Sequence, residues 1–206
     1  MSRQLLHHAS LLSLTLATSL TLLSIPYTNW ITLTINIPSS SSSSSNGPHA
    51  APPLTDSFGL FQRCTSPGSG PNRCVSFPEE RKCSESDMPF CNLWWTAGVL
   101  LGLAVPLMQV LTVVAFVRCC PKKWKLPAGV LVLTSGVQGF GVTIMAYLFD
   151  HDELFWVPGY QLGLSWYLAF LSAGTMFLTA CGMAIGASVL PTEKEYKLVL
   201  SEKSGV

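Results

Sequence analysis

The sequence predicts an all-α membrane protein, a four-helix bundle with a small, disulfide-stapled antiparallel β-sheet on its extracellular side. Three observations support this fold class: low charge, four long charge-free runs, and cysteines that fall into separate groups. Only 11% of the 206 residues are charged, whereas a soluble domain carries roughly 25%. The mean hydropathy is positive. This composition is typical of an integral membrane protein.

Four runs that contain no Asp, Glu, Lys or Arg are the predicted membrane helices. They cover residues 9–27, 93–117, 126–149 and 162–190. A helix needs about 20 apolar residues to cross a bilayer, and each run has about that length or more. Residues 28–92 then form a long first outer loop and residues 191–206 a cytosolic tail, so that residues 1–206 make one domain.

Basic residues predict the orientation in the membrane. The loop between the second and third predicted helices contains Arg118, Lys122, Lys123 and Lys125. The next loop, residues 150–161, contains no Lys or Arg. Because basic residues collect on the cytosolic side, we expect a multi-pass plasma-membrane protein with both termini in the cytosol. Residues 9–27 could instead be a cleaved signal peptide, but they lack an Ala-x-Ala site and cleavage would misplace the C-terminus.

Four cysteines lie in the predicted outer loop, where disulfides persist. They are Cys64, Cys74, Cys83 and Cys91. Three pairings are open, and the local solution, Cys64–Cys74 with Cys83–Cys91, is preferred. A zinc site is the competing interpretation, but neither a histidine nor a C-x-x-C spacing supports it.

The predicted cytosolic side carries two short motifs. Cys119 and Cys120 follow the second predicted helix, a position at which palmitoylation is common. The chain ends in Ser204-Gly205-Val206, which fits the C-terminal peptides that PDZ scaffolds bind by strand addition. Cys181, in the fourth predicted helix, is interpreted as a small apolar filler.

The outer loop has the alternating pattern of short strands. "WITLTINI" (residues 30–37) alternates with a period of two, and "FGLFQRC" (58–64) and "NRCVSF" (72–77) flank a Pro/Gly turn. A Ser-rich insertion, residues 39–53, falls in the turn between the first two strands. Three strands this short cannot hold a core alone. We therefore expect one face of the sheet to rest on the bundle, with a disulfide adding about 2–3 kcal/mol.

Nothing in the sequence predicts catalysis. The predicted spans contain no Asp, Glu, Lys, Arg or His, the residues that usually mark ion or proton transport. His49 and His151 lie alone on outer loops without a nucleophile motif. The net charge of +1 includes no basic block, so nucleic acid is not indicated. We expect no cofactor, no metal and no enzymatic activity.

Small and polar residues inside the predicted helices point to helix contacts. Gly98-x-x-x-Gly102 and Gly182-x-x-x-Gly186 allow close helix approach, either within the bundle or toward another membrane protein. Gln109 and Gln138 are expected to hydrogen-bond between helices.

Five tryptophans near the predicted helix ends are interpreted as interface anchors. They are Trp94, Trp95, Trp124, Trp156 and Trp166. The loop "ELFWVPGY", residues 153–160, is apolar, and both membrane anchoring and contact with another protein remain open for it.

A spaced set of residues in the outer loop resembles the claudin signature. It consists of Trp30, then Gly59-Leu60-Phe61 followed by Cys64, then Cys74. With the four-helix topology, the chain resembles along almost its whole length the superfamily of claudins, peripheral-myelin-protein-like tetraspans and calcium-channel γ subunits. "SFGLFQRC" is most similar to a further group, the lipoma-fusion-partner-like tetraspans, which have Phe in the third place of the motif.

The resemblance implies a non-enzymatic protein that acts through contacts. One expectation is an accessory or auxiliary subunit, or an adhesive scaffold, for another integral membrane protein such as a channel, a receptor or a second copy of itself. The alternative is a barrier- or pore-forming claudin of cell–cell junctions. Claudins carry Trp at the position of Phe61, and this departure favours the auxiliary subunit.

Overall fold

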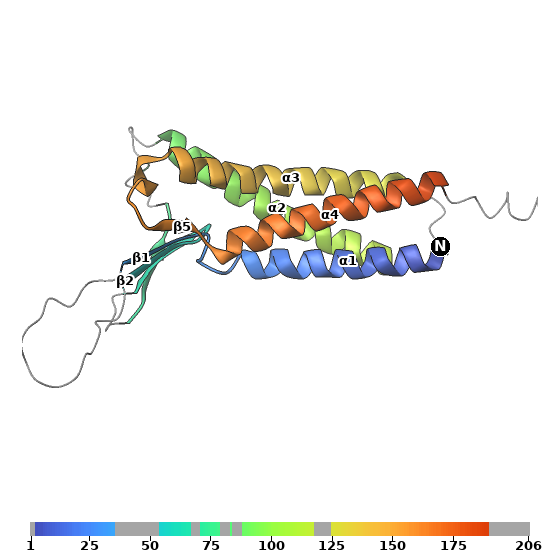
Figure 1. The fold of residues 1–206 in the computed structure, drawn as a ribbon, viewed down its shortest axis with the longest axis horizontal. Helices are drawn as coiled ribbons and strands as arrows, with labels where there is room; N and C mark the ends of the chain where they lie inside the picture. Colours follow the sequence, from blue (N-terminus) through green and yellow to red (C-terminus); the bar gives the residue numbers. More distant parts are fainter. Residues whose placement is uncertain are drawn as a thin grey trace, which may run out of the picture.

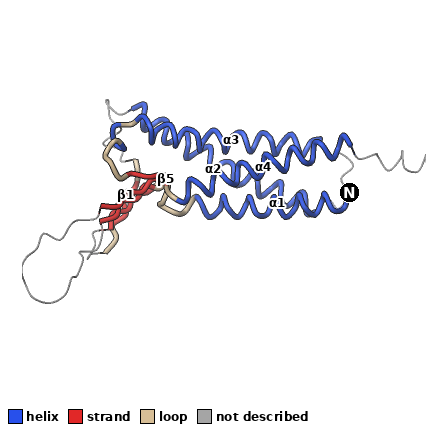
Figure 2. The backbone as a smooth tube through the Cα atoms, in the orientation of Figure 1, coloured by secondary structure: helices blue, strands red, loops and turns tan. Residues whose placement is uncertain are grey.

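The computed structural model describes residues 3–35, 54–66, 71–78, 83, 88–117 and 125–189. Within them, four long helices lie side by side and a β-sheet sits at one end of the bundle (Figure 1; strands red in Figure 2). The helices are α1 (Arg3–Ser24), α2 (Met88–Val117), α3 (Lys125–His151) and α4 (Leu164–Val189), with a short 3-10 turn, η1 (Glu153–Phe155), between α3 and α4. The predicted helical bundle with a small disulfide-bonded sheet is confirmed at this level.

Three of the four helices are long and apolar enough to cross a membrane. Their spanning segments are Met88–Val114, Ala128–His151 and Leu164–Gly186. In α1 the apolar segment, His8–Ser24, is shorter. The structure therefore supports a membrane protein, while the crossing of the bilayer by α1 stays a prediction.

The helices form a closed ring in which α1 and α3 each contact both α2 and α4. Small residues set the distance between α2 and α3: a Cβ placed on Gly141 would lie 3.0 Å from Leu101 Cγ and 3.4 Å from the Ala97 carbonyl oxygen. The predicted glycine pairs behave differently, because Gly102 and Gly182 have no atom within 4 Å of such a Cβ. Neither glycine mediates a helix contact inside the bundle.

The sheet has five antiparallel strands in the order β4-β3-β2-β1-β5. They are β1 (Ile31–Ile35), β2 (Leu54–Phe58), β3 (Gln62–Ser66), β4 (Arg73–Ser76) and β5 (Tyr160–Leu162). The three-strand prediction is wrong in two places. Residues 58–64 are not one strand, because the chain reverses between β2 and β3, where the Gly59 N–H donates to the Gln62 carbonyl at 2.7 Å. The fifth strand comes from the α3–α4 connection and pairs with β1.

The sheet rests on the bundle through a shared aromatic and aliphatic core. Buried Ile31 and Phe58 pair directly across β1 and β2, and belong to the same cluster as Trp94 of α2, Leu148 of α3 and Phe155 of η1. Burial of apolar surface contributes about 25 cal/mol per Å², so these buried side chains stabilise the contact between the sheet and the bundle. The sheet thus has the support from the helices that its small size requires.

Candidate functional site: the disulfide-linked sheet

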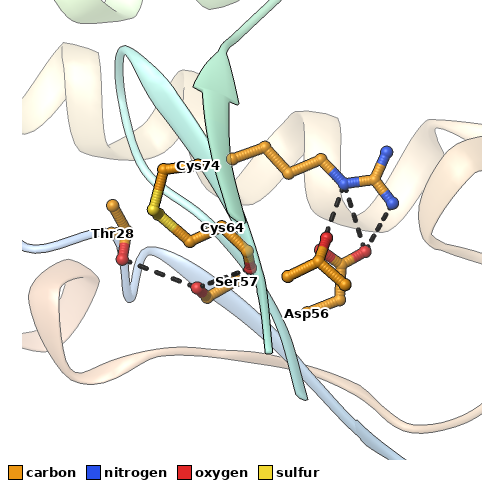
Figure 3. The surroundings of a disulfide bond; sticks show 7 residues. Thr28, Asp56, Ser57, Cys64 and Cys74 are labelled. Atoms are coloured by element: carbon orange, nitrogen blue, oxygen red, sulfur yellow. Dashed lines mark hydrogen bonds and ion pairs between the residues drawn. A yellow bond between two sulfur atoms is a disulfide. The ribbon is translucent and has the colours of Figure 1, made fainter. Parts of the chain in front are cut away.

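Two disulfides lie in this region, one within the sheet and one at the start of α2. Cys64 and Cys74 are direct partners across β3 and β4, with Cα atoms 4.1 Å apart, and Figure 3 shows this bond with Ser57 and Thr28 beside it. Cys83 is bonded to Cys91 in the first turns of α2. This is the local pairing that the sequence favours. One disulfide therefore closes the hairpin of β3 and β4, and the other ties the connection between β4 and α2 to the start of α2.

The residues of the claudin-like motif form the junction between sheet and bundle. Trp30 is buried, and its indole Nε1–H donates to the Ser24 carbonyl at the end of α1 at 2.9 Å. Gly59 is needed where the backbones come close, because a Cβ there would lie 2.9 Å from Thr28 Cα. Buried Leu60 supplies the carbonyl that accepts from the Trp94 indole N–H at 3.0 Å. These motif residues position the sheet rather than forming its exposed surface.

Phe61 is the motif residue that remains accessible. Its side chain is 47% exposed, and its ring lies 3.4 Å from the Cβ position of Gly98 on α2. The first glycine of Gly98-x-x-x-Gly102 thus faces an aromatic side chain of the loop rather than another helix.

A buried carboxylate that the sequence prediction missed lies on the bundle-facing side of the sheet. Asp56 of β2 is 7% exposed and accepts from the Arg63 guanidinium, with Nε–Oδ1 at 3.1 Å, and from the Thr65 hydroxyl at 3.2 Å. The Arg63 guanidinium carbon lies 4.7 Å from the Phe58 ring centroid, a cation–π contact. The contacts of Asp56 with Arg63 and Thr65 could have been predicted only if β2 had been predicted, because pairing of β2 with β3 brings Asp56 opposite Thr65.

The phenol of Tyr160 on β5 belongs to the same face. Burial raises its pKa above the usual value of 10.0, and the nearby Asp56 carboxylate raises the pKa further, while Arg63 opposes them. The phenol is therefore neutral at physiological pH. The described ionisable groups on this face are a paired carboxylate and guanidinium and a protonated phenol, an arrangement that stabilises a sheet and offers no activated nucleophile.

The tryptophans predicted to be interface anchors differ in exposure, and for the exposed ones anchoring stays a prediction. Trp95 is 58% exposed and Trp156 is also exposed, as anchors would be. Trp94 is 1% exposed and lies in the core, so the anchor interpretation is wrong for it. Trp166 is partly buried and its indole N–H donates to the Val142 carbonyl at 3.1 Å, which ties α4 to α3. Trp124 lies outside the described residues.

The loop after α3 exposes an apolar patch at the rim of the sheet. Asp152 caps η1 by accepting from the Leu154 N–H at 2.9 Å. Phe155 turns inward against Phe58, with ring centroids 5.5 Å apart, whereas Leu154, Trp156 and Val157 are exposed. Phe155 therefore anchors the loop to the core, and the other three apolar side chains of the loop remain exposed.

The two polar residues predicted to join helices have different positions. Gln138 is buried; its Nε2 donates to Thr21 Oγ1 of α1 at 3.2 Å and to the Ala169 carbonyl of α4 at 3.0 Å. Its prediction is confirmed. Gln109 is exposed on α2, and within the described part of the chain its amide makes no hydrogen bond. Gln109 therefore makes no hydrogen bond to another helix of the bundle, and a bond to a helix outside this chain stays a prediction.

Several predicted sites fall outside the described residues. These are Cys119, Cys120, Ser204, Gly205, Val206 and the Ser-rich insertion 39–53. Among the described residues, no group of three or more His, Cys, Asp or Glu side chains is arranged to hold a metal ion, and Cys181 is a partly buried free thiol in α4.

Comparison of the chain with protein-family models gives no match, and comparison with curated proteins gives none either.

Proposed function

We propose that this chain is a claudin-like tetraspan of the plasma membrane, with both termini in the cytosol, that serves as an auxiliary subunit or adhesive scaffold for another integral membrane protein. The observation that carries the proposal is the seating of the disulfide-linked sheet on the bundle by Trp30, Gly59 and Leu60. The same residues make up the claudin-like signature of the sequence, and their packing gives that resemblance a physical reason.

Binding rather than catalysis fits the chemistry of the sheet end. The carboxylate of Asp56 is already paired and buried. The exposed side chains there include five large apolar ones, Phe61, Val75, Leu154, Trp156 and Val157, beside polar ones such as Gln62, Arg73 and Glu153. Exposed aromatic and aliphatic side chains on a rigid frame are suited to protein contacts. Because these groups lie at one end of an apolar bundle, a partner that is itself in the membrane is favoured.

The second candidate is a barrier-forming claudin, which would polymerise between cells. The overall signature favours it. Phe61 argues against it, because claudins carry Trp at this position of the motif. We therefore rank the auxiliary subunit first.

Freeze-fracture of cells that lack junctional strands and express the chain separates the two candidates. Scattered particles, together with a membrane protein that co-purifies in mild detergent at fixed stoichiometry, would support the auxiliary subunit. Continuous strands would support the barrier. A matched pair of variants identifies the contact surface. Trp156→Ala should reduce co-purification. Leu178→Ala changes an equally exposed residue in α4, away from the sheet, and should not reduce it.

A further inference from the structure

One outward face of α2 carries a regularly spaced row of exposed residues. We call it the α2 seam, and it consists of Trp95, Val99, Gly102, Pro106, Gln109 and Val113. The spacing alternates between four and three positions, the repeat by which one helix packs along another in a left-handed crossing. Spacing alone does not distinguish a contact surface from a lipid-facing one, and the polar groups on the seam make that distinction.

Gln109 is the first of these polar groups. It lies eight residues before Val117, the last residue of α2, which is about 12 Å along the helix axis and thus inside the hydrocarbon core when α2 spans the membrane. Its exposed amide makes no hydrogen bond within the described part of the chain. An unsatisfied amide in hydrocarbon costs several kcal/mol in principle.

Other exposed polar side chains of the helices avoid this cost by bonding to their own backbone. The hydroxyls of Ser19, Thr96 and Thr143 donate to the carbonyls of Thr15, Asn92 and Gly139 at 2.9, 2.6 and 2.8 Å. Gln109 does not do so, and its amide is free to bond to a group outside the chain.

The second polar group is a backbone carbonyl. Pro106 lies inside α2 and has no N–H, so the carbonyl of Gly102, four residues earlier, loses its helical donor. Gly102 also has open space around its Cβ position. The backbone is therefore uncovered at this point of the seam, and another helix can approach it closely.

We propose that the occupant of the α2 seam is the α2 seam of a second copy of this chain. An amide both donates and accepts, so Gln109 is complementary to itself. Two copies inserted with the same orientation and related by a two-fold axis along the membrane normal place Gln109 opposite Gln109 and Gly102 opposite Gly102, at equal depths. This proposal concerns contact between copies and goes beyond the proposed function, which concerns a different protein.

Cysteine cross-linking of the full-length chain in cell membranes tests the geometry. Val99→Cys and Val113→Cys, each in a chain with Cys119, Cys120 and Cys181 replaced by Ser, should give a dimer of twice the chain mass on oxidation. Leu178→Cys on the exposed face of α4 is the matched control and should give none. Equal cross-linking of the control, or an adduct that contains a different protein, overturns the proposal.

A measurement of dimerisation tests the role of the amide. The full chain in phosphatidylcholine vesicles, counted by single-molecule photobleaching, should dimerise, and Gln109→Leu should weaken dimerisation about three- to tenfold, given the usual strength of interhelical hydrogen bonds. Gln109→Asn should retain most of it. Intact disulfides in each variant, by mass mapping, show that the chain is folded. A monomeric wild type, or a Leu variant that dimerises as well as wild type, contradicts the inference.

Discussion

Asp56 is a carboxylate with little access to solvent, and its neighbours compensate for that burial. Arg63 and Thr65 both donate to it, and the Arg63 guanidinium also lies over the Phe58 ring. One acidic side chain therefore connects β2, β3 and the aromatic core beneath the sheet. A group in this position contributes to the uniqueness of the fold as well as to its stability.

We expect Asp56→Ala to lower the free energy of unfolding by about 1–3 kcal/mol, because it removes the carboxylate from a partly exposed guanidinium. The double variant Asp56→Ala/Arg63→Ala should be less destabilised than the sum of the two single variants. Thermal unfolding in detergent measures both effects, with Arg73→Ala, an exposed residue of β4, as the control. Additive losses would show that the pair is not coupled.

The hairpin formed by β3 and β4 depends on its cross-strand disulfide. Each strand is short, and β4 is exposed along its whole length, so burial contributes little to their pairing. The bond closes a loop of ten positions, a constraint worth roughly 2–3 kcal/mol in the unfolded chain.

Replacing Cys64 or Cys74 by Ser should therefore cause retention in the endoplasmic reticulum while the helices still insert. The double variant should be no worse than either single one, because all three lose the same bond. Surface biotinylation measures delivery, with Cys181→Ser, the free thiol of α4, as the control that reaches the surface. Normal delivery of the Cys64 or Cys74 variants would show that the hairpin folds without its disulfide.

The connection from β5 to α4 depends on a glycine. A Cβ at Gly163 would overlap the carbonyl group of Asn29, and the Gly163 N–H donates to the Trp30 carbonyl at 2.8 Å. Because the atoms of Asn29 in this contact belong to the backbone, they cannot move aside as a flexible side chain could. We expect Gly163→Ala to abolish surface delivery, whereas Gly174→Ala, which has open space in α4, should be delivered normally. Surface biotinylation of the two variants side by side makes the comparison, and equal delivery would contradict it.

Helices were easier to predict from the sequence than strands. The bounds of the second, third and fourth predicted helices agree with those of α2, α3 and α4 to within a few residues. A long apolar run without charged residues is a strong signal for a membrane helix. Strand β5 has three residues and exists only because β1 offers it an edge, a tertiary cause that leaves no local pattern. Trp94 and Trp95 are sequence neighbours with opposite burial, and only the position of the sheet decides which one faces inward.

For the candidate site, the motif residues and the disulfide pairing could be predicted, whereas the buried ion pair could not. Cys64 and Cys74 lie ten positions apart around a turn, so their pairing is local. Asp56 lies three positions after the end of the Ser-rich insertion in the sequence, and nothing in its flanking residues distinguishes it from a solvated loop carboxylate. Its role depends on a strand pairing that the sequence pattern does not reveal.

At the scale of the whole molecule, the sheet and the chain's first described residues lie at opposite ends of the bundle. In Figure 1 the N-terminal end of α1 and the last turn of α4 share one end, and the strands occupy the other. If the helices cross a membrane, the sheet and the other end of the bundle lie on opposite sides of it, and the location of the sheet outside the cell stays a prediction from the basic residues.

Epitope tags at both termini should consequently be reached by antibody only after cells are permeabilised. A tag inserted in the serine run, residues 39–45, which lies outside the described residues, should label intact cells. Fluorescence of labelled cells with and without detergent makes the measurement. Labelling of either terminus on intact cells would contradict a protein with four membrane spans.

The pairing of β1 with β5 has a consequence for the order of biosynthesis. Ile31 pairs with Leu162, so β1 leaves the ribosome before its partner β5, by about ten seconds at ordinary elongation rates. During that interval the edge of β1 has no β5 beside it, and Gly163 is not yet there to bond to Trp30. The sheet is therefore complete only after residues 160–162, which precede α4, have been made, and a chain that stops before them leaves this edge of β1 without its partner strand.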